Sequence, residues 1–169
     1  AQSYLAGLLA DFAKPRWTTA ETLRRPIALL LDEAMTRTGG ERFERLRVLG
    51  DGVLYTTGFF RRHLESRGVA LAYVAALGAR AYDHAATMLN GRNATEGASD
   101  VLRELARNFE MFTLLLNEVA DALLAQSAPA TARATLELYE TWLCSRSEPL
   151  ARALIERGLV PLRGSETLH

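Results

Sequence analysis

The sequence predicts an all-α protein, a single-domain bundle of six or seven helices with a long central helix pair. Leucine and alanine fill 56 of the 169 positions, and both residue types favour helices. Valine and isoleucine together fill only nine positions, whereas proteins built from β-strands are rich in β-branched residues. Hydrophobic residues make up 49% of the chain, which is too large a share for a disordered protein.

Two short helices and one extra helical turn are expected before residue 40. The first helix is predicted over 4–13. Thr18 and Glu21 then form a capping-box pattern, which predicts a further turn of helix. Pro26 suits the first turn of a helix, so a second one is predicted over 27–37.

A long helix is predicted over 41–67, because apolar residues recur there at steps of three and four along two neighbouring rows. Two apolar rows indicate two buried sides, so this helix should be central. Gly50, Gly52 and Gly58 lie inside it, and each costs about 1 kcal/mol relative to alanine in a helix interior. These glycines indicate either close packing against another helix or a break near residues 50–52.

Two further long helices are predicted, over 70–90 and 100–126, with a loop over 92–98 between them. Small residues fill the middle of the first, which lets another helix approach closely. The second carries an unbroken repeat of three and four residues, made by Leu102, Leu105, Phe109, Phe112, Leu116, Val119 and Leu123. Such a regular apolar stripe is typical of a bundle core or of a dimer seam.

Two shorter helices should end the chain. Pro129 opens the first of them, and four residues are expected to face inward: Ala132, Leu136, Tyr139 and Leu143. Cys144 follows on the same apolar side, where it is interpreted as a structural thiol. Ser147 is the expected N-cap of the last helix, and Gly158 suits its left-handed C-cap position. We therefore predict one helical domain over 1–161 and a flexible tail over 162–169.

The charge pattern argues against nucleic-acid and membrane binding. The 20 basic and 20 acidic residues leave no net charge, and the two signs are interleaved rather than gathered on one face. The longest uncharged run has 12 residues, against roughly 20 for a membrane span. The first residues lack the basic start of a secretory signal, and a single cysteine forms no internal disulfide. A cytoplasmic protein is therefore expected.

No catalytic or cofactor motif is recognisable in the sequence. It has no phosphate-binding glycine loop and no nucleophile elbow. His63 and His84 have no partners at metal-ligand spacing, because their acidic neighbours point to other sides of a helix. We therefore expect a non-enzymatic protein with no metal and no cofactor.

The segment 48–60 is the most unusual, because it combines three glycines with a single charge, Asp51. One interpretation is a ligand pocket between this segment and the helix over 70–90. Its polar contacts would be Asp51, Tyr55, Thr57 (or its neighbour Thr56), Tyr73 and Tyr82. The other interpretation is tight helix packing, with Asp51 at an exposed edge and paired with Arg47 four residues before it.

Two functions from different classes remain. The first is a non-enzymatic helical interaction module that self-associates into a homo-oligomer or binds a protein partner. Zero net charge and the regular apolar stripe favour it, because nothing keeps copies of the chain apart. The second is a small-molecule sensor or binding protein, which would hold a small ligand with apolar and polar parts between segments 48–60 and 70–90.

Overall fold

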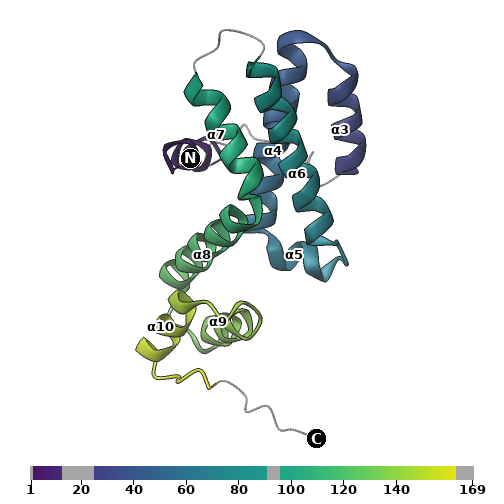
Figure 1. Ribbon diagram of the computed structural model, residues 1–169. Helices are drawn as coiled ribbons and strands as arrows, with labels where there is room; N and C mark the ends of the chain where they lie inside the picture. Colours follow the sequence, from purple (N-terminus) through teal and green to yellow (C-terminus); the bar gives the residue numbers. More distant parts are fainter. Residues whose placement is uncertain (1, 13–24, 91–95, 163–169) are drawn as a thin grey trace, which may run out of the picture. The chain divides into compact units, whose positions relative to one another are not determined.

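The computed structural model describes residues 2–12, 25–90 and 96–162 (Figure 1). This part of the chain contains nine α-helices and no strand, so the predicted all-α class is confirmed. The chain divides into two compact units, Ala1–Asn117 and Glu118–His169, and each is described by itself. The domain limits predicted above stay a prediction, and residues 163–169 of the expected tail lie outside the described residues.

The helices of the first unit are α1 (Gln2–Phe12), α3 (Ile27–Thr36), α4 (Gly39–Phe59), α5 (Arg61–Ser66), α6 (Leu71–Asn90) and α7 (Glu96–Arg107). Helix α8 (Phe109–Ser127) begins in the first unit and continues into the second, which also holds α9 (Ala132–Ser145) and α10 (Glu148–Glu156). The helices predicted over 4–13, 27–37 and 70–90 correspond to α1, α3 and α6. The helical turn expected at Thr18 lies outside the described residues.

Helix α4 is the centre of the first unit, and it packs against α3, α5 and α6. Its middle turns are enclosed on nearly every side, so that Leu46, Val53 and Leu54 have no exposed surface. Leu46 and Val53 belong to one of the two apolar rows read from the sequence, and that row is buried from Leu46 to Thr57. In the other row, Val48, Tyr55 and Phe59 are half-buried. Burial of this kind is the main source of stability in a helical bundle.

Glycines allow α4 and α6 to approach their neighbours closely. A Cβ atom added at Gly50 would lie 2.7 Å from the ring of Tyr82, and one added at Gly58 would lie 2.5 Å from Cβ of Leu116. A Cβ at Gly78 of α6 would lie 2.5 Å from the Phe109 ring. Helix α4 runs unbroken through residues 50–52. Of the two interpretations of these glycines, close packing is therefore confirmed and a break near 50–52 is wrong.

Two helices predicted as continuous are each divided. The helix predicted over 41–67 is interrupted at Phe60, whose φ of −117° and ψ of 25° leave the helical region. The helix predicted from residue 100 begins at Glu96 and is interrupted at Asn108. There the backbone N–H and the side-chain amide of Asn108 both donate to the carbonyl oxygen of Glu104, at 3.0 and 3.2 Å. The side chain thus shares this acceptor with the regular helical hydrogen bond, which is still made.

The second unit has its own small core, in which α9 contributes Leu138 and Trp142 and α10 contributes Leu150 and Leu154. The predicted inward face of α9 is therefore wrong in part. Three of the four residues expected inside, Ala132, Leu136 and Leu143, are exposed, and so is Cys144; only Tyr139 is half-buried. Trp142 is the largest apolar side chain on the helix, and burial of its ring selects the face that turns inward.

The ends of α9 and α10 show which capping predictions hold. Helix α9 begins at Ala132 rather than at Pro129, and Thr131 is its N-cap. The side-chain oxygen of Thr131 accepts a hydrogen bond from the backbone N–H of Ala134 at 3.2 Å. Ser147 occupies the predicted N-cap position of α10, although its side chain makes no capping hydrogen bond. Gly158 has a φ of +79°, as the predicted left-handed position requires.

Replacement of Gly50 by alanine should destabilise the protein by about 1–3 kcal/mol, because the added methyl group overpacks the contact with Tyr82. The same change at Gly40 is the matched control. A Cβ at Gly40 meets nothing within 4 Å, so Gly40→Ala should leave stability unchanged or raise it by up to about 1 kcal/mol. Urea denaturation of both variants measures the difference, and equal effects at the two positions would refute the close packing.

Candidate functional site

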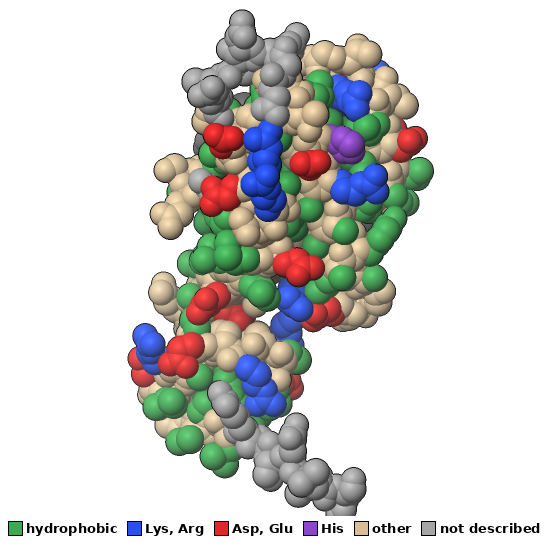
Figure 2. All heavy atoms as spheres, in the orientation of Figure 1, with side chains coloured by type: hydrophobic (Ala, Val, Ile, Leu, Met, Phe, Trp, Pro, Cys, Tyr) green, Lys and Arg blue, Asp and Glu red, His purple; other side chains and the backbone are tan. Residues whose placement is uncertain are grey.

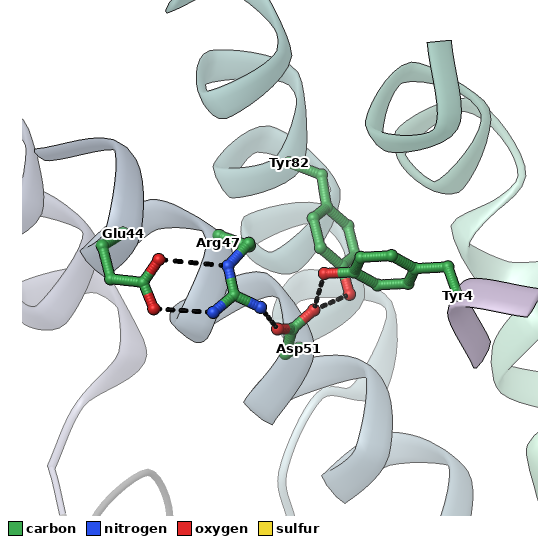
Figure 3. A network of polar contacts seen from close by, with 5 residues as sticks. All are labelled: Tyr4, Glu44, Arg47, Asp51 and Tyr82. Carbon is green, nitrogen blue, oxygen red and sulfur yellow. Dashed lines mark hydrogen bonds and ion pairs between the residues drawn. The ribbon is translucent and has the colours of Figure 1, made fainter. Parts of the chain in front are cut away.

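Asp51 lies in the middle of α4 with no exposed surface, yet it carries a carboxylate. One carboxylate oxygen accepts hydrogen bonds from the hydroxyls of Tyr4 and Tyr82, at 2.6 and 2.8 Å. The other accepts a hydrogen bond from the guanidinium of Arg47 at 2.9 Å (Figure 3). Both oxygens are therefore satisfied, which a buried carboxylate requires.

Arg47 connects the buried carboxylate to the surface of α4. Its guanidinium also donates two hydrogen bonds to Glu44, at 2.6 and 3.2 Å (Figure 3). Glu44 and Asp51 lie three residues before and four residues after Arg47, which places all three on one side of the helix. The predicted pairing of Asp51 with Arg47 is confirmed, but the expected exposed edge is wrong, because Asp51 is fully buried.

Burial governs the proton affinities within this network. It raises the pKa of the Asp51 carboxyl, while the hydroxyls of Tyr4 and Tyr82 and the charge of Arg47 oppose that rise. Burial and then the negative charge of Asp51 raise the pKa values of Tyr4 and Tyr82 well above 10. Both tyrosines thus remain hydrogen-bond donors far into the alkaline range. The hydrogen bond to Glu44 raises the pKa of Arg47, and the charge of Asp51 raises it further.

The network joins three helices, because Tyr4 comes from α1, Tyr82 from α6, and Asp51 from α4 (Figure 3). Tyr82 also rests its ring on Gly50, one residue from the carboxylate it binds. A substrate would reach Asp51 only by displacing one of these partners. The arrangement therefore serves to pack α1 and α6 against α4, and it does not present an accessible general base.

The structure brings together only two of the five residues predicted to line a ligand pocket, Asp51 and Tyr82. Tyr55 instead stacks on Phe59 with ring centroids 4.8 Å apart. Thr57 is buried, and its hydroxyl bonds to the carbonyl oxygen of Val53 at 2.7 Å and lies 3.4 Å from the hydroxyl of Thr113. Tyr73 is exposed. Binding of a ligand by these five residues stays a prediction.

Thr57 and Tyr73 line two different pockets of the first unit. Thr57 belongs to a pocket of about 290 Å³ between α4, α6 and α8, where Arg61 and Glu110 are also found. Tyr73 belongs to a pocket of about 370 Å³ between the start of α3, the α4–α5 junction and α6. That second pocket also contains Thr56, the neighbour of Thr57, and its walls are mainly apolar.

Sequence reasoning missed Tyr4, which lies 47 positions from the carboxylate it binds. No local pattern connects residues so far apart in the chain. The spacing of Tyr73 and Tyr82, however, could have shown from the sequence that the two residues do not line the same pocket. Nine positions are two and a half helical turns, so the two rings must leave α6 on opposite sides.

The residues that the structure describes include neither a metal-binding cluster nor a membrane-spanning helix. No group of three or more His, Cys, Asp or Glu side chains there is close enough to hold a metal ion. Within the same ranges, no helix has the length and hydrophobicity needed to cross a membrane.

Comparison of the chain with protein-family models, curated proteins and solved structures gave no match.

The buried network predicts loss of stability at alkaline pH. Tyr4 and Tyr82 keep their protons in the folded state above pH 10, whereas the unfolded chain releases them near pH 10. The free energy of unfolding should therefore hold below pH 10 and fall above it, by about 1.4 kcal/mol per pH unit for each tyrosine.

Above pH 10, Tyr4→Phe should make the free energy of unfolding fall less steeply, by about 1.4 kcal/mol per pH unit less than in the wild type. Urea unfolding followed from pH 8 to 11 measures this slope. Tyr73→Phe is the matched control, because it removes an exposed hydroxyl outside the network, and it should leave the slope unchanged. A slope that is the same in the wild type and in Tyr4→Phe would contradict the assignment of this hydrogen bond.

Proposed function

We propose that the chain is a non-enzymatic helical interaction module that self-associates through the first half of α8 and the adjoining surface of α6. The observation that carries this proposal is that α8 is apolar on two opposite sides within the first unit. Phe109, Phe112 and Leu116 face the core and are buried. Met111, Leu114 and Leu115 lie on the other side of the helix, and each is at least half exposed.

These three exposed side chains, Met111, Leu114 and Leu115, are here called the α8 apolar face. Single exposed leucines are ordinary on protein surfaces. Three large apolar side chains within five residues, opposite a face that is already buried, are more typical of a contact surface. The predicted stripe, Leu102 to Leu123, is thus buried as far as Leu116, while the proposed seam is a separate face of the same helix.

The surface beside the α8 apolar face is hollowed and lined by small residues. Ala75, Ala76 and Ala79 of α6 line a hollow of about 360 Å³, and Met111 lines it too. The chain therefore carries large side chains and a matching hollow next to each other. In a pair of copies related by a two-fold axis, the large side chains of each copy meet the hollow of the other.

The charges around the hollow are compatible with a second copy of the chain. Arg107 and Glu110 both line it, so a copy turned by the two-fold axis offers each of them a partner of opposite sign. Figure 2 shows acidic and basic side chains interspersed on the visible face. The chain has no net charge, and copies therefore do not repel each other strongly.

Leu115→Glu should weaken self-association at least tenfold, which corresponds to about 1.4 kcal/mol. The reason is that a charge on the α8 apolar face would have to be desolvated in the dimer. Leu29→Glu is the matched control, because Leu29 is equally exposed but lies on α3. Sedimentation equilibrium over micromolar to high micromolar concentrations measures the effect, and circular dichroism checks that both variants fold.

Two outcomes would refute the proposal. One is a wild-type chain that stays monomeric at high micromolar concentration. The other is an equal loss of association in Leu29→Glu and Leu115→Glu, which would show that added charge alone, rather than this face, decides the result.

A further inference from the structure

We propose that helix α9 binds α9 of a second copy of the chain, antiparallel to it, through an apolar row that the second unit leaves uncovered. This row, here called the α9 row, consists of Ala132, Leu136, Tyr139 and Leu143. Helix α9 belongs to the second unit, whereas the α8 apolar face belongs to the first. The inference therefore does not rest on the proposed contact through α8.

Helix α9 is apolar on two sides. Its inner side carries Ala134 and Leu138, which are buried, and Leu138 packs in the core with α10. The members of the α9 row follow one another at steps of four, three and four residues, so they share the other side of the helix. Leu136 is 57% and Leu143 40% exposed. A surface helix needs only one apolar side, and a second one at this spacing is typical of contact with another helix.

The charges beside the α9 row favour a second copy of the same helix as its partner. Arg133 and Glu140 lie seven residues apart, close to two helical turns, and so on the same edge of the row. In an antiparallel pair related by a two-fold axis, this edge of one helix lies beside the same edge of the other. Arg133 of each copy then faces Glu140 of the other, and the dimer gains two ion pairs.

The existing partner of Arg133 does not prevent this exchange. Arg133 pairs with Glu137 of its own helix at 3.2 Å, and the two side chains are 91% and 63% exposed. An ion pair so open to water contributes little to stability. Arg133 can therefore turn to Glu140 of a second copy at small cost.

The other edge of the α9 row specifies the antiparallel orientation. It carries Thr135 and Trp142, and Trp142 is buried with the guanidinium of Arg146 4.6 Å from its ring centroid. In a parallel pair, each edge lies beside the opposite edge of the partner. Glu140 would then face Thr135, and neither ion pair would form.

The small size of the contact sets its expected strength. Each copy contributes four apolar side chains from a helix of 14 residues. That is less surface than the roughly 800 Å² per partner that is usual in stable complexes. We therefore expect a weak, reversible dimer that forms at high micromolar concentration.

The test is a charge swap in the full chain, with Leu115→Glu in every variant so that the α8 apolar face does not contribute. Arg133→Glu and Glu140→Arg each place like charges opposite one another, so either variant alone should self-associate about fivefold less tightly or worse. The variant with both substitutions should recover the affinity of the parent. A mixture of the two single variants should also associate, because each meets the opposite charge in the other. Sedimentation equilibrium up to submillimolar concentration measures all four samples.

A matched pair of variants tests the apolar contact itself. Leu136→Glu should abolish the association, because the added charge would have to be desolvated in the dimer. Ile155→Glu is the control, since Ile155 is also 57% exposed but lies on α10 of the same unit. It should leave the association unchanged, and circular dichroism checks that both variants fold.

Three results would overturn the proposal. One is a Leu115→Glu parent that stays monomeric at submillimolar concentration, which would show that a second copy does not cover the α9 row. The others are a mixture of Arg133→Glu and Glu140→Arg that does not associate, and an equal loss in Leu136→Glu and Ile155→Glu. The α8 apolar face is tested separately, by the comparison of the wild type with Leu115→Glu.

Discussion

The contact between α4 and α6 is the constraint on which the rest of the first unit depends. Gly50 and Gly78 remove the side chains that would hold these helices apart, and the ring of Tyr82 then lies directly on the α4 backbone. At this distance the Tyr82 hydroxyl reaches Asp51, which also receives Tyr4 of α1. A single buried carboxylate thus attaches two helices to the central one. Arg47 supplies the positive charge that helps such a carboxylate to remain inside the protein.

This packing decides which parts of the unit are available for function. By its type and its glycine-rich surroundings, Asp51 is the residue that the sequence favoured most as a ligand contact. In the structure it is fully buried, and its carboxylate binds side chains of the protein itself. The residues left to bind a partner or a ligand are those on the surface that do not pack in the core. The proposed function rests on one such region, the α8 apolar face. Its neighbours along the helix, Phe112 and Leu116, are buried in the core.

Helical periodicity predicted most of the fold. The cost of glycine within a helix indicated either close packing of α4 or a break near residues 50–52, and the structure shows the packing. The breaks at Phe60 and Asn108 were not predictable from the same pattern, because the apolar repeat continues across both residues. The repeat records which side of a helix is buried, and it carries no signal for a local change of backbone dihedral angles such as that at Phe60. Leu136 and Leu143 were misplaced because simple spacing gave them the same weight as Trp142, whose larger ring determines the buried face. For the candidate site, the partner of Asp51 on its own helix was predictable, but Tyr4 was not, since that contact depends on tertiary structure.

The central functional claim is that two copies of the chain meet through the α8 apolar face. Site-directed cross-linking tests it most directly, with Leu115→Cys and, as control, Leu29→Cys, each combined with Cys144→Ser because Cys144 is exposed. A short bis-maleimide should convert the Leu115→Cys protein to covalent dimers at low micromolar concentration and leave the Leu29→Cys protein mostly monomeric. Equal cross-linking at the two positions, or none at residue 115, would contradict the account.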